Sequence, residues 1–326
     1  MTDNFESTQR IPINELSVSV EKLKDEIRKV IVGQEKMVEL MLISLLADGH
    51  LLIEGVPGVA KTLAAKLMAK LVQAKFSRIQ FTPDLMPGDV IGTAIFNSAE
   101  ARFHFSAGPI FGNLILIDEI NRAPAKTQSA LFEVMEERQI TVDGVTHKME
   151  FPFMVLATQN PIEQEGTYRL PEAQLDRFLF KIQVGYPGLE EEIAILLQHQ
   201  QQPQNELLLE MEPVISIDTL IHCRQIVQQV LIDPKLVEYI ARIVNETRNN
   251  PNLYLGASTR ASLALLKSAK VLAAMRNRDF VIPEDIKEMA FPVLRHRIIL
   301  TPEKEMEGLT ADLLIENMLK TVEIPR

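Results

Sequence analysis

The chain has 326 residues, of which 46% are hydrophobic and 24% charged, as in an ordinary soluble protein large enough for two domains. Its formal net charge of −10 argues against a broad electropositive surface for nucleic acid. The single cysteine, Cys223, excludes an internal disulfide framework and favours the reducing cytoplasm. With no secretory signal near the start and no run of about 18 apolar residues, we expect no membrane span.

Two helices are expected before the first strand. Apolar residues at helical spacing, from Leu16 to Ile27, predict an amphipathic helix over residues 13–30, and a second is expected over about 35–47. The segment between them contains Val32 next to Gly33. Val32 is a candidate for an adenine pocket, and a plain turn between two packed helices explains it equally well.

Residues 55–62 read Gly-Val-Pro-Gly-Val-Ala-Lys-Thr, between an apolar strand at 51–53 and a helix. Strand, glycine-rich turn and helix form the context of a phosphate-binding loop, in which backbone N–H groups and the helix N-terminus surround phosphate oxygens. Lys61 can reach the β- and γ-phosphates, and the Thr62 hydroxyl can ligate Mg²⁺. The candidate ATP-binding residues are Gly55, Val56, Pro57, Gly58, Val59, Ala60, Lys61, Thr62 and Leu63.

Position 60 departs from the usual pattern, which has glycine before the lysine. Because alanine disfavours a positive φ, we expect Ala60 to lie in an ordinary region of backbone space. The alternative interpretation is a glycine-containing loop before a helix, with Lys61 merely solvated.

A β-hairpin is expected in the proline- and glycine-rich region that follows a second strand at 78–81. Its strands are predicted over 90–96 and 102–105, which places the hairpin near 93–105.

The continuous apolar run 114–117 suits a strand that is buried on both faces of a parallel sheet. It ends in Asp118 and Glu119. Asp118 is placed to hold Mg²⁺ through water, and Glu119 to activate an attacking water. Without other motifs, Asp118 and Glu119 would be interpreted as two solvated acids at a strand end. Because they follow a candidate phosphate loop by about 55 residues, the functional interpretation is favoured.

A helix is predicted over 124–137, followed by a second hairpin over 139–151 around Asp143-Gly144. A buried strand at 153–157 leads to Asn160, whose amide could contact the γ-phosphate or its water. An isolated Asn-Pro would simply be a turn. A short helix from about 170 to 177 and a last strand at 178–184 complete this part.

Beyond residue 187 no strand is expected. The predicted organisation is an α/β nucleotide-binding domain over 1–187 and a smaller all-helical domain over 188–326. Helices are predicted over 189–200, 216–230, 234–248, 258–275 and 283–295, and the glutamine-rich stretch 198–205 is read as a loop.

Taken together, these motifs resemble those of MoxR-type AAA+ ATPases. In chain order they are Gly-Val-Pro-Gly-Val-Ala-Lys-Thr, Leu-Ile-Leu-Ile-Asp-Glu-Ile-Asn-Arg-Ala, Ala-Thr-Gln-Asn-Pro, Leu-Pro-Glu-Ala-Gln-Leu-Asp-Arg-Phe and Gly-Ala-Ser-Thr-Arg-Ala. The resemblance runs from about Val30 to Leu300, and an alanine at position 60 looks typical of the family.

The resemblance implies a P-loop core with a parallel five-stranded sheet, a helical lid, and Mg²⁺-dependent ATP hydrolysis in a ring, usually hexameric. It makes Arg177 the candidate finger toward a neighbouring subunit's γ-phosphate, Arg260 the second sensor and Asn160 the first. The two hairpins are similar to the insertions of the clade shared with magnesium chelatase. Family members resemble chaperones and often act with a partner that carries a von Willebrand A domain. The alternative for Arg177 is a salt bridge with Asp176 or a nearby acid, and for Arg260 it is an arginine at a helix start on a solvated face.

Three functions are therefore weighed. The leading one is an ATP-hydrolysing machine that remodels partner proteins. A DNA motor is disfavoured by the net charge and by a hairpin tip, 143–146, that offers no Arg or Lys before Lys148. A nucleotide-gated scaffold with little turnover is disfavoured by the presence of Glu119 and Lys61.

Overall fold

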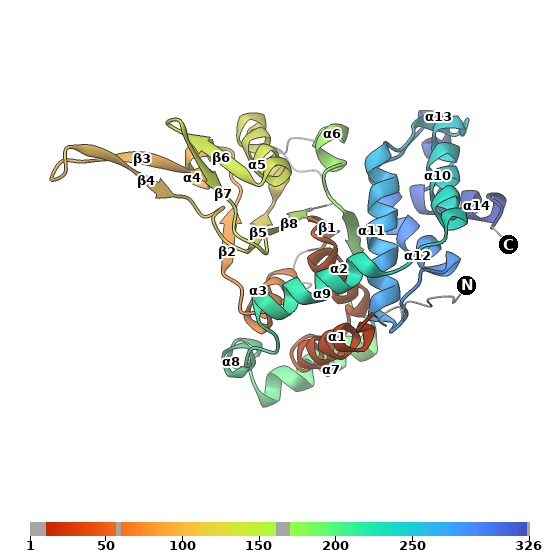
Figure 1. Ribbon diagram of the computed structural model, residues 1–326, viewed down its shortest axis with the longest axis horizontal. Coiled ribbons are helices and arrows are strands. Elements are labelled where there is room, and N and C mark those ends of the chain that lie inside the picture. Colours follow the sequence, from red (N-terminus) through yellow and green to blue (C-terminus); the bar gives the residue numbers. More distant parts are fainter. Residues whose placement is uncertain (1–10, 57–59, 161–169, 325–326) are drawn as a thin grey trace, which may run out of the picture.

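The computed structural model describes residues 11–56, 60–160 and 170–324, so the predicted loop residues Pro57, Gly58 and Val59 lie outside the described residues (Figure 1). Its centre is a five-stranded sheet in the order β2-β5-β8-β1-β9. The strands are β1 (Leu51–Gly55), β2 (Phe76–Gln80), β5 (Leu114–Asp118), β8 (Met154–Gln159) and β9 (Phe180–Val184). This confirms the predicted parallel five-stranded α/β core.

Strand β5 shows why these segments pair. Its apolar residues from Leu114 to Ile117 are fully buried, as expected of a strand covered on both faces. β5 pairs with β2 and β8, and β1 with β8 and β9, all in parallel. The carboxyl ends of all five strands therefore lie at one edge of the sheet, and their amino ends at the opposite edge.

The helices before residue 187 follow the predicted pattern closely. They are α1 (Ile13–Arg28), α2 (Glu35–Ala47), α3 (Lys61–Leu71), α4 (Pro87–Ile91), α5 (Ala125–Glu137) and α6 (Glu172–Leu175), with a 3₁₀ turn, η1 (Ile120–Arg122). Pro124 lies just before α5 in an extended conformation, so it precedes the helix rather than starting its first turn.

Both predicted hairpins are present, and Figure 1 shows the first projecting far from the sheet. They are formed by β3 (Gly92–Asn97) with β4 (Arg102–Ala107), and by β6 (Gln139–Val142) with β7 (Val145–Lys148). The ring of Phe105 stacks on that of His147, with centroids 4.3 Å apart, so the base of the first hairpin packs on the second.

The C-terminal part is largely but not wholly helical, which corrects the prediction for 188–326. Its helices are α7 (Leu189–Gln201), α8 (Gln204–Glu210), α9 (Ile217–Gln229), α10 (Pro234–Asn249), α11 (Thr259–Met275), α12 (Pro283–Leu294), α13 (Pro302–Met306) and α14 (Ala311–Thr321). Strands β10 (Leu253–Leu255) and β11 (Ile299–Leu300) pair antiparallel, although both are too short for a periodic signal. The glutamine-rich stretch is also mostly helical, since glutamine has good helix propensity.

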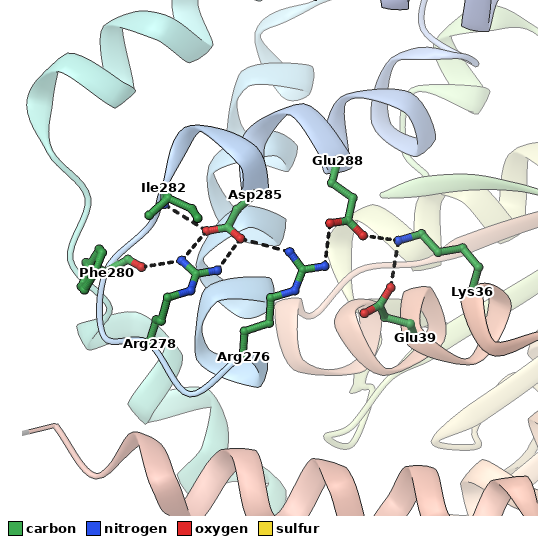
Figure 2. A network of polar contacts seen from close by, with 8 residues as sticks. All are labelled: Lys36, Glu39, Arg276, Arg278, Phe280, Ile282, Asp285 and Glu288. Atoms are coloured by element: carbon green, nitrogen blue, oxygen red, sulfur yellow. Dashed lines mark hydrogen bonds and ion pairs between the residues drawn. The ribbon is translucent and has the colours of Figure 1, made fainter. Parts of the chain in front are cut away.

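The N-terminal helices pack against the C-terminal ones. Buried side chains of α1 and α2 belong to the same hydrophobic cluster as those of α9, α11 and α12. Figure 2 shows the ionic part of this contact: Lys36 of α2 meets Glu288 of α12 at 2.5 Å, and Glu288 meets Arg276 at 2.6 Å. The packing therefore connects α2, whose end leads into strand β1 of the sheet, to the helices beyond residue 187.

Candidate active site

The edge formed by the carboxyl ends of the strands, here called the phosphate edge, contains the start of the predicted loop. Gly55 ends β1 opposite Val184 of β9. A Cβ atom at position 55 would lie 2.6 Å from the Val184 carbonyl oxygen, so only glycine fits between the two backbones. The first glycine of the motif is thus required by strand packing as well as by the turn.

Ala60 precedes α3 in the left-handed region, with φ 56° and ψ 16°. The expectation of an ordinary φ was therefore wrong. The carbonyl of Ala60 accepts the N–H of Ala64 at 2.9 Å, so the residue begins the helix while its backbone turns the loop. Left-handed backbone costs a residue with a Cβ about 1–2 kcal/mol, which the surrounding structure must offset.

Lys61 is half-buried, and its Nζ donates to the Gly55 carbonyl at 2.8 Å. Burial lowers the pKa of Lys61, while the charges of Asp118 and Glu119 raise it. The two carboxylates act on the Lys61 ammonium group because they lie near it at the end of β5, as a phosphate site requires. Thr62 and Leu63 follow in the first turn of α3 and are partly buried.

Thr158 of β8 holds both acidic residues at the end of β5. Its hydroxyl donates to Asp118 Oδ1 at 3.3 Å and accepts the backbone N–H of Glu119 at 3.1 Å. Asp118 Oδ2 is paired with Arg78 Nε at 2.7 Å. Glu119 has a left-handed φ of 57°, so the chain turns sharply between the two carboxylates.

The carboxylate of Glu119 is held by two further side chains. Oε2 accepts from Gln80 Nε2 at 3.1 Å and pairs with Arg122 Nε at 2.9 Å. Sequence reasoning did not select Gln80, Arg122, Arg78 or Thr158. The strand order reveals Arg78, Gln80 and Thr158, because β2 and β8 flank β5 on both sides. Arg122 reaches Glu119 from the 3₁₀ turn that follows it.

Asn160 and Val32 are the other two residues predicted for the phosphate edge. Asn160 directly follows the end of β8 and is half-buried. Val32 is half-buried beside Gly33, and a cavity of about 370 Å³ is lined by Ile31, Gly33 and the Lys36–Glu288 pair. Among the described residues no cluster of three or more His, Cys, Asp or Glu could hold a metal. A magnesium ion held by Asp118, Thr62 and phosphate oxygens needs no such cluster.

Arg177 and Arg260 lie together at the opposite edge, here called the arginine edge. Arg177 precedes β9, and its guanidinium donates to the Phe132 carbonyl and lies 3.7 Å from Glu136. Arg260, in the first turn of α11, pairs with the same Glu136 at 2.6 Å. Of the salt bridges weighed for Arg177, the one with a nearby acid is present, to Glu136, whereas Asp176 pairs instead with Arg297 at 2.8 Å.

A cavity of about 240 Å³ opens at the arginine edge. It is lined by Arg138, Arg177, Arg260, Lys267 and Arg297, together with Asp48, Glu136 and Asp176. Five basic side chains thus face three acidic ones, which leaves an excess of positive charge suited to an anionic group. Strand β9 separates this cavity from the phosphate edge by about 16 Å, the length of five extended residues.

Comparison with known proteins agrees with both the fold and the motifs. The profile of the ATPase family associated with various cellular activities (AAA) matches residues 50–180, and that of the AAA lid domain matches residues 245–318. The chain is 48% identical to YeaC of Bacillus subtilis over 93% of this chain and 94% of that protein. It is 46% identical to chaperone MoxR1 of Mycobacterium tuberculosis over 94% of this chain and 83% of the relative.

A solved structure has the same fold. The crystal structure of a protein from Cytophaga hutchinsonii superimposes with a TM-score of 0.89 at 43% identity, covering 96% of this chain and 97% of that one. No helix within the described residues is long and apolar enough to cross a membrane. With its phosphate loop, paired strand-end acids and lid, the chain belongs to the MoxR-type AAA+ ATPases, which bind nucleotide and hydrolyse ATP.

Proposed function

We propose that this protein is a chaperone-like machine that remodels partner proteins and hydrolyses ATP between two copies of itself. The observation that carries the proposal is the separation of the two edges. Arg177 and Arg260 lie about one strand length, roughly 16 Å, from the end of β1, where the phosphate loop begins. An arginine side chain cannot span that distance, so these residues suit the nucleotide of a neighbouring copy.

At the phosphate edge each residue has one role in the proposal. The backbone of 55–60 and Lys61 bind the phosphates, Thr62 and Asp118 hold Mg²⁺, and Asn160 orients the attacking water. Bound Mg²⁺ would neutralise phosphate charge. Glu119 accepts the proton of the water, while Gln80 and Arg122 hold its Oε2 in place. Val32 contacts the base.

At the arginine edge, the proposed role is to stabilise charge on the transferring phosphoryl group. Because phosphoryl transfer depends mostly on positioning and charge, such an arginine contributes on the order of 10³–10⁵ in rate. Supplying it from a neighbour makes hydrolysis depend on assembly, as in an oligomeric AAA+ ATPase. We propose a hexameric ring and, from the family resemblance, a cytoplasmic location and a partner with a von Willebrand A domain.

The first hairpin supports a protein client. Phe96 and Phe103 pair across β3 and β4 on one face, and their side chains are 54% and 68% exposed. Exposed aromatic side chains suit contact with another polypeptide better than with a phosphate backbone, which calls for cations.

Two variants test the proposal. Glu119→Gln should lower ATP turnover at least about 100-fold while ATP affinity stays within a few-fold of wild type, because a general base contributes 10²–10⁴. Glu133→Gln, an exposed position on α5, is the matched control. Retained turnover in Glu119→Gln would contradict the assignment. The same variant in ATP should retain client proteins in a pull-down.

The trans arrangement is tested by mixing. Arg177→Ala should bind ATP normally and hydrolyse it poorly, and adding Glu119→Gln subunits should restore part of the activity. In such rings, an intact Glu119 can face an intact Arg177 from the other variant. Steady-state ATPase at fixed total protein, over a series of ratios, should rise above both pure variants. A straight line between them, with assembly checked by light scattering and mixed rings shown by co-purification of a tagged and an untagged variant, would mean that Arg177 serves its own site or only the fold.

A further inference from the structure

Helix α7 exposes an apolar face that none of the described residues covers. Its residues Leu189, Ile193, Leu196 and Leu197 are 76%, 49%, 65% and 54% exposed. Among the described helices longer than ten residues, α7 alone has no buried residue. The spacing i, i+4, i+7, i+8 puts the four side chains on one side of the helix, the pattern of a face that packs against another surface. These four residues are the α7 stripe.

The rest of the helix is attached to the body at the phosphate edge. Gln198 donates to the Lys29 carbonyl at 2.5 Å, and the Glu191 carboxylate packs on Gly33, where a Cβ would lie 2.8 Å from Glu191 Cδ. α7 also begins five residues after Val184, the carboxyl end of β9. Figure 1 shows α7 beside α1 at the bottom and α6, which precedes Arg177, at the top.

We infer that the α7 stripe is the docking surface for the arginine edge of a second copy of this chain. The inference rests on the proposed function, in which the ATP site at one phosphate edge is complete only when a neighbour supplies its Arg177. A second copy must then approach the phosphate edge, where the stripe lies. The contact is head-to-tail, so repeating it closes a ring or extends a filament.

The chemistry of the two surfaces is complementary. On α11, Arg260, Leu263 and Lys267 are exposed at spacing i, i+3, i+7 and line the cavity of the arginine edge, with Leu263 57% exposed. The α7 stripe would cover Leu263. The exposed carboxylates of Glu190 and Glu192, in the first turn of α7, would face Lys267, which leaves Arg260 to the nucleotide. Opposite charges around an apolar centre are typical of a specific interface.

Assembly tests the inference directly. The full chain with Ile193→Asp and Leu197→Asp should need at least tenfold more protein than wild type for half-assembly in ATP, measured by sedimentation velocity. Its ATPase activity should be reduced in proportion to the loss of assembly. Its affinity for ATP, measured at protein concentrations too low for assembly, should equal that of wild type. Val237→Asp with Leu313→Asp is the matched control, since those side chains are 45% and 49% exposed on α10 and α14. Thermal unfolding of each variant checks the fold.

A photo-crosslinking residue in place of Leu196 identifies what covers the stripe. We expect crosslinks to residues 259–267 of another copy, found by mixing isotopically light and heavy protein. Crosslinks confined to one chain, or to another face of the neighbour, would overturn the inference, as would wild-type assembly of the Asp variant. If Arg177→Ala and Glu119→Gln still complement each other in that case, the proposed function stands and only the α7 assignment falls. If the wild-type protein stays monomeric in ATP, both the proposed function and the α7 assignment are overturned.

Discussion

At the residue scale, Lys61 is the most sharply placed member of the phosphate edge. It donates to the Gly55 carbonyl and lies within the field of Asp118 and Glu119. In the ATP-bound protein its charge would turn from that carbonyl to the β- and γ-phosphates. A charge-assisted hydrogen bond of this kind contributes about 1.5–3 kcal/mol.

Lys61→Ala should therefore weaken ATP binding at least about tenfold, since that contribution corresponds to a factor of 10 or more. Isothermal titration calorimetry measures the change. Lys66 is exposed on the same helix. Lys66→Ala removes the same charge from the same helix and should bind ATP as wild type does. Affinity of Lys61→Ala within a few-fold of wild type would mean that the loop has been assigned wrongly.

His50, which lines the cavity of the arginine edge, couples stability to pH. It is buried between Met135, whose carbonyl lies 3.2 Å from Nε2, and Val155, whose N–H donates to Nδ1 at 3.0 Å. Burial, and then the charge of Arg138, lower the pKa of His50 to about 4. Because the ordinary pKa is about 6.5, protons bind the unfolded chain preferentially between these values.

The stabilisation from neutral His50 is thus present above pH 6.5 and is lost as the pH falls toward 4. Between pH 6 and pH 5, wild type should lose about 1 kcal/mol of unfolding free energy more than His50→Gln, which cannot titrate. Urea unfolding at the two pH values gives the difference. Equal losses in the two proteins would show that His50 is not buried in its neutral form.

At the element scale, α12 is held by a fully buried carboxylate. Asp285 is 0% exposed and accepts from Arg278 at 2.6 Å, while its other oxygen accepts the Ile282 N–H at 3.0 Å (Figure 2). Arg276 lies 3.5 Å away and continues the network to Glu288 and Lys36. The same carboxylate therefore caps α12 and ties it to the end of α11.

Asp285→Asn should lower the free energy of unfolding by about 3–5 kcal/mol, the usual cost of removing one partner from a buried ion pair. Glu288→Gln is the control, because its side chain is 31% exposed and an ion pair near the surface contributes about 1 kcal/mol or less. Chemical denaturation provides both values. If the two variants lost the same free energy of unfolding, the burial of Asp285 would not explain the contribution of its ion pairs to stability.

Much of the architecture could be predicted from the sequence, and the exceptions have physical causes. Apolar runs such as 114–117 and helical periodicity such as Leu16 to Ile27 depend only on neighbours along the chain. Short strands such as β11, with two residues, carry no period at all. Thr158 was missed because its role arises only when β8 lies beside β5, and strand order is not a local property.

At the scale of the whole molecule, the two edges of the sheet carry what we propose to be complementary halves of one site. The phosphate edge has the loop and the acids, and the arginine edge has Arg177 and Arg260, which share Glu136. Because both arginines sit on the same edge, a neighbouring copy would deliver them together. Arg260 should therefore act across the subunit boundary, as we propose for Arg177, and not on the nucleotide of its own chain.

Mixing Arg177→Ala with Arg260→Ala decides between these arrangements. If both arginines come from one neighbour, every site in a mixed ring faces an edge that lacks one of them. The ATPase activity should then follow a straight line between the two low values of the pure variants. If Arg260 served its own chain, an Arg177→Ala subunit beside an Arg260→Ala subunit would form a complete site, and activity would rise above both. Arg177→Ala mixed with Glu119→Gln is the positive control and should gain activity, while co-purification of a tagged and an untagged variant confirms that mixed rings form.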